Sequence, residues 1–236
     1  VRGLAWEGFA RRDPQYYIDP ALGPGRGLEE FRAGGRDVVQ WALSWAGRLP
    51  DRDRALEIGS GLGRNTVHLA RHFAHVDGVD VSATMVRQAR ARGLPANVAL
   101  HALSGRDLRP MADASYALVF SHLVFQHVES WEAIGSYLRE IGRVLEPGGV
   151  AVLQFDTRPA SRLVALGYRL PDPLLPRARR RGIRRRRRNP DAIRAVGTQA
   201  GLELEEELHP GSAEHWLRWR RAWLNTDAGT PGPPGP

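Results

Sequence analysis

The hydrophobic and polar positions of this chain alternate between two periods along most of its length. Short apolar runs bounded by glycine or polar residues predict strands at 54–58, 76–81, 98–102, 116–121 and 150–155. Apolar residues recur at helical spacing in the intervening segments 65–73, 83–92 and 131–145. Strands that alternate with helices predict an α/β fold with a parallel, doubly wound sheet.

The two ends of the chain extend this pattern. Residues 1–50 contain a Gly/Pro-rich loop at 19–27 and then a helical pattern through Phe31, Val39 and Trp45, which predicts an N-terminal helical extension. The helix before the fifth strand is expected to stop at the EPGG of 146–149. A helix at 190–200 and strands at 202–208 and 214–220 complete the expected fold.

The composition excludes several classes of protein. The 236 residues include no cysteine, so a disulfide scaffold and a cysteine zinc site are excluded, and no metal site is expected. No apolar run approaches the roughly 20 residues of a membrane span, and no signal-type stretch opens the chain. We therefore expect a cytoplasmic protein. All basic residues are arginine, which points to a GC-rich, bacterial coding sequence.

The net charge of +8 comes from one arginine tract, residues 177–188. This stretch, RARRRGIRRRRR, holds 9 of the 34 arginines, and the other 25 nearly balance the 26 acidic residues. Flanking prolines oppose one continuous helix, and the like charges repel one another. Three interpretations remain open: a solvated surface segment, recognition of a phosphate or carboxylate substrate, or contact with nucleic acid or acidic lipid. The absence of aromatic residues within the tract disfavours a base-stacking platform.

A glycine-rich turn follows the first predicted strand. EIGSGLG places Gly59, Gly61 and Gly63 between a strand and a helix, where the backbone can bend sharply and approach a ligand. The dinucleotide pattern G-x-G-x-x-G is not met, because Arg64 and Thr66 occupy the positions where its last glycine would fall. Asp80 ends the second strand, where an acid can accept hydrogen bonds from both ribose hydroxyls. A nucleoside-bearing cofactor is therefore expected.

Four ordered motifs resemble the class I S-adenosylmethionine-dependent methyltransferases. They are ALEIGSGLGRNTVHLA, GVDVSATMVRQAR, DASYALVFSHLVFQHV and RVLEPGGVAVLQF, and together they cover about residues 54–156. The resemblance implies a mostly parallel seven-stranded Rossmann-like sheet with an antiparallel last strand. It also implies that S-adenosylmethionine is the cofactor and S-adenosylhomocysteine the product.

The resemblance implies a cofactor site at the carboxyl ends of the first strands. The turn would contact the methionine part, Asp80 the ribose, and the residues after the second and third strands the adenine. Arg64 would reach the methionine carboxylate or be an exposed residue at the helix start, and Met85 would contact the cofactor or pack in the core. The cofactor-binding residues implied in this way are Glu57, Gly59, Ser60, Gly61, Gly63, Arg64, Asp80, Val81, Met85, Ser104, Gly105, Arg106 and Ser121.

Two positions depart from the pattern of that family. Ser104 stands where many members carry an acid that meets the adenine amine, and Ala117 replaces a common aspartate of the fourth strand. These replacements put cofactor affinity in doubt. They also motivate the alternative of a non-catalytic S-adenosylmethionine-binding protein.

The candidate catalytic residues follow the fourth and fifth strands. They are His122, Asp156 and His127, with Gln154 as a further polar group at the mouth of the site. An imidazole could take a proton from a hydroxyl or amine near neutral pH. His122 is the candidate base or substrate ligand, Asp156 is a similar candidate, and a structural role is favoured for His127. Aromatic residues near the N-terminus, Trp6, Tyr16 and Tyr17, would form a lid or cover the sheet.

The sequence therefore predicts a methyltransferase domain at 51–228 after an N-terminal extension at 1–50. It carries an insertion at 157–189, containing the arginine tract, and ends in a disordered Gly/Pro tail at 229–236. The expected reaction is methyl transfer to an oxygen or nitrogen of a small molecule, which could be anionic. The alternatives are an RNA methyltransferase anchored by the arginine tract and the non-catalytic binding protein. A nicotinamide oxidoreductase is a third, weaker possibility, and the oligomeric state stays open.

Overall fold

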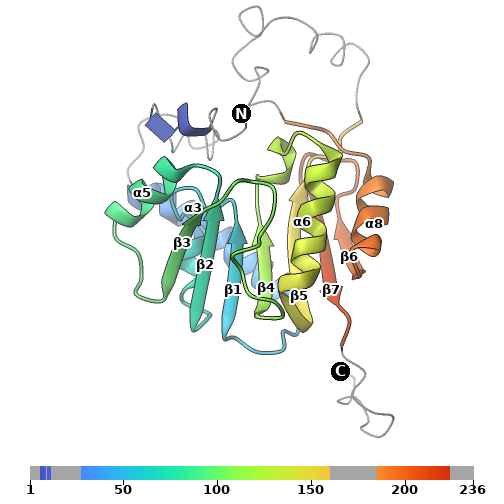
Figure 1. Cartoon of the computed structure of the whole chain (residues 1–236), viewed down its shortest axis with the longest axis horizontal. Helices are drawn as coiled ribbons and strands as arrows, with labels where there is room; N and C mark the ends of the chain where they lie inside the picture. Colours follow the sequence, from blue (N-terminus) through green and yellow to red (C-terminus); the bar gives the residue numbers. More distant parts are fainter. Residues whose placement is uncertain (1–5, 9, 12–27, 160–184, 224–236) are drawn as a thin grey trace, which may run out of the picture.

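A twisted sheet with helices on both faces forms the centre of the computed structural model, which describes residues 6–8, 10–11, 28–159 and 185–223 (Figure 1). Its strands run in the order β3-β2-β1-β4-β5-β7-β6. They are β1 Arg54–Ile58, β2 His75–Asp80, β3 Val98–Ala102, β4 Tyr116–Ser121, β5 Leu145–Phe155, β6 Leu202–Leu208 and β7 His215–Arg221. The helices are α3 Leu28–Ala46, α4 Thr66–Leu69, α5 Ala83–Ala91, α6 Trp131–Val144 and α8 Pro190–Gln199, with the 3₁₀ turn η2 Phe125–His127.

The first five strands are parallel, and β7 is antiparallel to both β5 and β6. The doubly wound, mostly parallel, seven-stranded sheet predicted from the sequence is confirmed. The strand order reverses between β1 and β4, which pair with each other at the centre of the sheet. In sheets of this kind a ligand binds outside the carboxyl ends of the strands at such a switch point.

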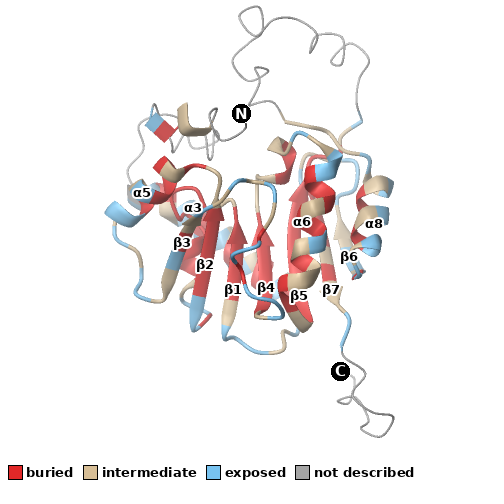
Figure 2. Cartoon of the chain, viewed as in Figure 1, coloured by how far each residue is buried: buried red, intermediate tan, exposed pale blue. Residues whose placement is uncertain are grey.

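Each face of the sheet has its own core, and the buried residues of the two run through the central strands (Figure 2). On one face α3 packs Val39, Ala42 and Ala46 against β4 and β5. On the other face α6 packs Leu138 and Ile141 against the same strands, and α8 packs Ile193 beside α6 and β6. Successive side chains of a strand point to opposite faces, so a strand covered on both faces is apolar throughout. This explains why Ala117–Phe120 is an unbroken apolar run that is entirely buried.

The helix expected at 65–73 is shorter than predicted, because α4 covers only Thr66–Leu69. Beyond Leu69 the backbone tightens, since the N–H of Arg71 donates to His68 and that of His72 to Leu69. The Asn97 side chain donates hydrogen bonds from Nδ2 to the carbonyls of Ala70 and Phe73, at 2.9 and 3.0 Å. A side chain from the turn before β3 therefore replaces the hydrogen bonds that a longer helix would make.

The helix before 146–149 ends within one residue of the expected Leu145, but the strand that follows begins earlier than the expected residue 150. Helix α6 already ends at Val144, and residues 146–149 belong to the long strand β5. The pairing with β4 shifts there, from Tyr116 opposite Leu145 to Leu118 opposite Val150. Gly148 has a φ of 77°, which accommodates this irregularity.

Candidate active site

The glycine turn leaves β1 at the carboxyl edge of the sheet. Gly59, Gly61 and Gly63 have φ values of 78°, 52° and 79°, a left-handed conformation that other residues rarely adopt. The N–H groups of Gly59 and Ser60 both donate to the Val79 carbonyl, at 2.7 and 3.1 Å. A Cβ on Gly59 would lie 2.2 Å from Val124 Cγ2, so no side chain fits there.

Glu57 lies beneath this turn with its carboxylate fully enclosed. Asn65 Nδ2 donates to Oε1 at 2.9 Å, and Thr66 Oγ1 donates to Oε2. Burial raises the pKa of Glu57 to about 7, although both hydrogen bonds favour the charged form. The carboxylate thus ties the start of α4 to the end of β1. Its direct contact with a cofactor stays a prediction.

Asp80 faces the turn from the end of β2. Its Oδ2 accepts the Gly61 N–H at 2.9 Å, and its Oδ1 accepts the Ser82 N–H at 2.8 Å. Burial raises the pKa of this carboxyl group. Each carboxylate oxygen can accept more than one hydrogen bond, so both can also receive the hydroxyl groups of a ribose. Ser60 Oγ, in the same turn, is buried and has no hydrogen-bond partner among the described residues. These groups fit the polar part of a nucleoside cofactor.

The residues expected near adenine lie around the loop after β3. Gly105 packs closely against Val81. A Cβ added at Gly105 would lie only 2.5 Å from Val81 Cγ1. Ser104 and Arg106 are exposed on either side of this glycine. Met85 is buried in a small cluster with Ala10, Phe31 and Leu62, which favours a packing role over cofactor contact.

Residues 6–8 and 10–11 of the N-terminal segment lie over the carboxyl edge of the sheet (Figure 1). Glu7 Oε1 accepts hydrogen bonds from Thr84 N at 3.1 Å and Ser82 Oγ at 3.2 Å. Gln88 Nε2 donates to the Ala10 carbonyl at 2.9 Å. The segment is thereby held against α5 beside Asp80, as a lid would be. Tyr16 and Tyr17 lie outside the described residues.

His122 follows β4 directly, at the carboxyl edge of the sheet. Its Nδ1 lies 3.4 Å from Arg64 Nη2, and its ring stacks on Trp216 at a centroid distance of 5.1 Å. Burial, together with the charges of Arg64 and Arg185, lowers the pKa of His122 to about 3. The next residue, Leu123, has a φ of 61°, and Gln154 Oε1 accepts its N–H at 2.9 Å. The contacts with Arg64 and Trp216 hold the imidazole in place.

Arg64 is buried beside His122 rather than exposed at the helix start. Its backbone lies against α3, where a Cβ on Gly35 would be 2.4 Å from the Arg64 carbonyl oxygen. The alternative of an exposed arginine is therefore wrong.

Asp156 and His127 are engaged in other contacts. Asp156 is fully buried, and Arg158 contacts both of its oxygens, Nε to Oδ1 at 3.0 Å and Nη2 to Oδ2 at 2.5 Å. The His127 ring packs edge-on against Trp6 at 5.3 Å, and its Nε2 lies 3.2 Å from Gln126 Nε2. Both arrangements favour structural roles.

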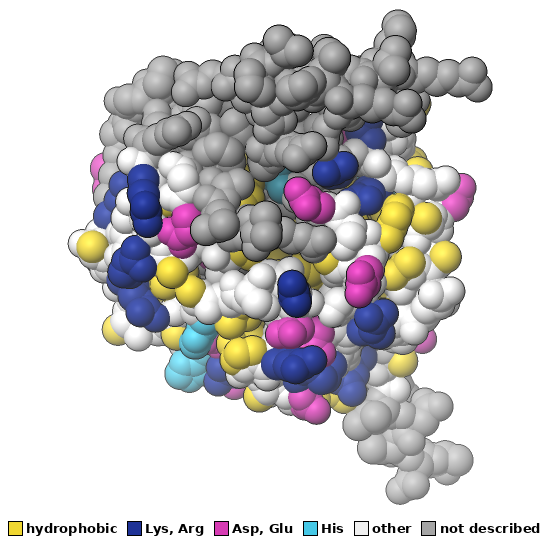
Figure 3. Space-filling model, turned by 45° about the horizontal axis from the view of Figure 1, so that its top comes forward, with side chains coloured by type: hydrophobic (Ala, Val, Ile, Leu, Met, Phe, Trp, Pro, Cys, Tyr) yellow, Lys and Arg dark blue, Asp and Glu magenta, His cyan; other side chains and the backbone are white. Residues whose placement is uncertain are grey.

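The described end of the arginine tract, residues 185–188, docks beside this region. The N–H groups of Arg186 and Arg188 donate to the carbonyls of Gln126 and Asp156. The Arg188 guanidinium donates to the carbonyls of Val128 and Glu129, at 2.5 and 3.0 Å, and covers the Trp131 ring. The rest of the tract lies outside the described residues. On the face shown in Figure 3, basic and acidic side chains of the described part are interspersed.

Comparison with known proteins identifies this arrangement. The family model described as a methyltransferase domain matches residues 56–153. Demethylmenaquinone methyltransferase of Mycobacterium sp. strain KMS is 32% identical over 173 residues, 70% of either chain. The chain belongs to the class I S-adenosylmethionine-dependent methyltransferase family. S-Adenosylmethionine is accordingly its cofactor.

Two further methyltransferases extend the comparison. Trans-aconitate 2-methyltransferase of Rhodopseudomonas palustris is 37% identical over 108 residues, which cover 45% of this chain and 40% of the relative. The crystal structure of an S-adenosylmethionine-dependent methyltransferase from Mesorhizobium loti superimposes with a TM-score of 0.61 at 18% identity, covering 78% of this chain and 98% of that one. The chain spans about half the length of the first curated relatives it matches.

Sequence reasoning missed two residues that the structure places at this candidate site. Trp216, which supports His122, lies opposite Gln154 in the antiparallel pairing of β5 with β7. Only the strand order brings it there, and the alternation of β7 predicts its face but not its neighbour. Glu7 carries no motif, and its role depends on the fold of the N-terminal segment.

No three His, Asp or Glu side chains within the described ranges come together in a way that could hold a metal ion. No helix in that same part of the chain has the length and apolar character needed to cross a membrane.

Proposed function

We propose that this protein transfers a methyl group from S-adenosylmethionine to an oxygen or nitrogen of a small molecule. The observation that carries the proposal is the pairing of the Gly59–Gly63 turn with Asp80, in a chain of this family. Two relatives support a small acceptor through their names, since one acts on trans-aconitate and the other on demethylmenaquinone.

The residues divide the work between binding and positioning. S-Adenosylmethionine supplies a methyl group on a positively charged sulfur. Asp80 would hold the ribose hydroxyls, and the backbone of the turn would lie along the methionine part. Residues 6–11 would exclude water from above, and His122 would contact the acceptor. Because the reaction is an in-line displacement, holding the two reactants in line and dry supplies most of the acceleration.

Calorimetric titration of the full chain with S-adenosylmethionine, S-adenosylhomocysteine and, as a control, NAD tests this proposal. Dissociation constants in the micromolar range are expected for the first two, with no binding of NAD. Failure of both to bind would overturn the proposal. Binding without methyl transfer to any acceptor would favour the non-catalytic alternative.

A further inference from the structure

We infer that the methyl acceptor is a carboxylate and the product a methyl ester. The inference rests on the proposed function and is carried by the geometry around His122, Arg64 and Asp156. It replaces the general choice of oxygen or nitrogen by one chemical class.

The contact with Arg64 determines what His122 offers to a substrate. A guanidinium carries five N–H donors and no acceptor, so His122 Nδ1, 3.4 Å from Arg64 Nη2, must be the acceptor. The proton of the neutral ring then sits on Nε2. His122 therefore presents an N–H group rather than a lone pair. A hydroxyl or ammonium acceptor needs a base, whereas a carboxylate oxygen accepts such a donor directly.

The polar side chains Ser121, Gln154 and Asp156, at the ends of β4 and β5, are already engaged in hydrogen bonds or ion pairs. Both oxygens of Asp156 pair with Arg158. Gln154 uses its amide oxygen for Leu123 N and its nitrogen for the Ala213 carbonyl, at 2.9 and 2.7 Å. Ser121 Oγ donates to the Ile58 carbonyl at 3.1 Å. Among the described residues at these two strand ends, the one carboxylate, Asp156, is paired with arginine and is not available as a base.

The charges around His122 favour an anion. Arg64 and Arg185 both act on the ring, and burial together with these charges lowers the pKa of His122 to about 3. An imidazole with so low a pKa is a weak base at neutral pH. The same positive potential stabilises a bound carboxylate, to which an arginine can donate two hydrogen bonds.

The chemistry of ester formation matches a site whose described residues offer no free base. A lone pair of the carboxylate oxygen forms the new O–C bond as the S–C bond breaks, and the electron pair of that bond stays on sulfur as a neutral thioether. The carboxylate and the sulfonium neutralise each other, and no proton is released. Nothing in the step requires a base.

The first experiment compares matched acceptors under one set of conditions. The full chain is incubated with tritiated-methyl S-adenosylmethionine and with succinate, citrate, benzoate, benzamide, benzyl alcohol, benzylamine or the small-molecule fraction of a bacterial lysate. Alkali hydrolyses methyl esters to methanol but leaves N-methyl and ether products intact. Volatile, base-released tritium is the expected result. Labelled product that is stable to alkali would overturn the carboxylate assignment.

The two levels of the proposal fail differently. Transfer to an amine or an alcohol alone would leave the proposed function standing and overturn only this inference. Binding of S-adenosylmethionine with no transfer to any acceptor would overturn the proposed function, and this inference with it.

Variants then test the role of each residue. Arg185→Gln is expected to raise KM for the carboxylate roughly tenfold with little change in kcat, because it removes a charge-assisted contact. Arg139→Gln loses the same charge at an exposed site on α6 and should change neither constant. His122→Asn, which keeps an N–H donor, should retain more activity than His122→Ala, and kcat should stay flat between about pH 6 and pH 9. A kcat that rises with pH through a base, or equal loss in both His122 variants, would contradict the donor role.

Discussion

The carboxylate of Glu7 accepts a hydrogen bond from the backbone N–H of Thr84, in the first turn of α5. Two residues earlier, the N–H of Ser82 donates to the carboxylate of Asp80. Hydrogen bonds from Thr84 and Ser82 lower the pKa of Glu7, so it is charged at neutral pH. An anion is favourable at a helix N-terminus, and this one fastens the N-terminal segment to the first turn of α5.

Glu7→Ala is therefore expected to weaken S-adenosylmethionine binding by roughly three- to tenfold, mainly through faster dissociation, because the segment 6–11 loses its attachment to α5. Calorimetry and stopped-flow fluorescence measure the two effects. Glu132→Ala, at an exposed position on α6, serves as the control. Equal affinities of the Glu7 variant and the parent would mean that this segment is not a lid.

The two sides of the site should separate under mutation. Asp80→Ala is expected to abolish measurable cofactor binding, because the Gly61 and Ser82 N–H groups lose their acceptor and the ribose loses its carboxylate. His122→Ala should leave the dissociation constant within about twofold and reduce turnover. Calorimetry and a methyl transfer assay on both variants check this. Normal affinity in the Asp80 variant would remove Asp80 from the cofactor site.

The buried carboxyl of Glu57 should make stability depend on pH. Its pKa rises from 4.5 to about 7 on folding, so between these values the folded chain binds a proton that the unfolded chain lacks. The contribution of this group to the free energy of unfolding is present in full below about pH 4.5. It is lost as pH rises toward about 7, by up to about 3 kcal/mol.

Glu57→Gln mimics the protonated form and should abolish this component. Urea denaturation of both proteins at about pH 5 and pH 8 measures it. The parent should lose more stability than the variant between the two pH values. Parallel losses would show that Glu57 titrates normally.

Two neighbouring glycines of α3 should respond in opposite ways to alanine. At Gly34 a Cβ would lie 3.7 Å from Arg64 Nη1, an ordinary contact, so Gly34→Ala should stabilise the protein by roughly 0.5–1 kcal/mol. At Gly35 the Cβ would lie 2.4 Å from the Arg64 carbonyl oxygen. This oxygen belongs to the backbone that directly follows the Gly59–Gly63 turn, so it cannot shift unless the turn shifts as well. Gly35→Ala should therefore cost roughly 1–3 kcal/mol. Thermal unfolding of the Gly34→Ala and Gly35→Ala variants measures both changes in stability. A stabilised Gly35 variant would contradict the close packing of α3 on the turn.

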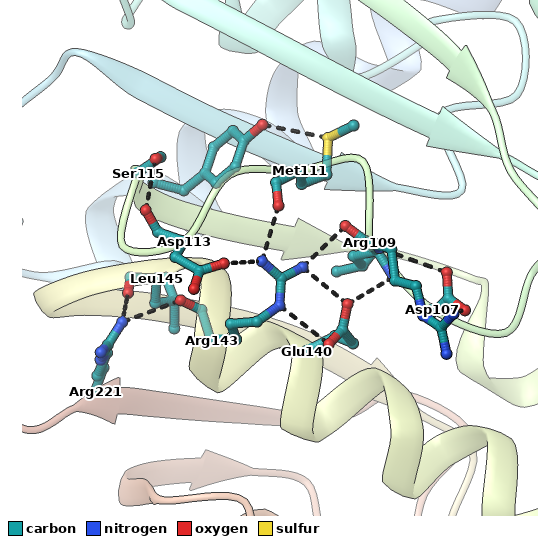
Figure 4. Close-up of polar contacts among 11 residues, drawn as sticks. Asp107, Arg109, Met111, Asp113, Ser115, Glu140, Arg143, Leu145 and Arg221 are labelled. Carbon is teal, nitrogen blue, oxygen red and sulfur yellow. Dashed lines mark hydrogen bonds and ion pairs between the residues drawn. The ribbon is translucent and has the colours of Figure 1, made fainter.

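Arg143 joins α6 to the loop before β4 at the opposite edge of the sheet (Figure 4). Its guanidinium donates to the carbonyls of Leu108 and Met111, at 3.0 and 2.9 Å, and pairs with Glu140 and Asp113. Arg143→Met should cost about 2 kcal/mol, because two carbonyl groups lose their donors.

Arg109→Met, in the same loop, is the matched control for Arg143. This side chain is 85% exposed and pairs with Asp107 at 3.4 Å, so its loss should stay within about 0.5 kcal/mol. Equal urea midpoints for the two variants would show that the Arg143 network contributes nothing.

The sequence was sufficient for features that depend on local chemistry. Strand and helix order follow from periodicity, and the turn with Asp80 follows from glycines at a strand end and an acid at the next. It was insufficient where distant segments meet. The length of α4 is decided by Asn97, and the burial of Arg64 by the close approach of α3 at Gly35. Neither partner can be found from the local pattern, because each comes from an element whose position only the packed fold defines.

The position of β7 has a consequence for the order in which the protein acquires its site during synthesis. This strand lies between β5 and β6, so β6 leaves the ribosome before it has a neighbour in the sheet. Trp216 of β7 also provides the surface on which the His122 ring stacks. A nascent chain that stops short of residue 216 contains the glycine turn and Asp80 but lacks the ring on which His122 stacks. We expect such a chain to bind the methyl donor before it can position an acceptor.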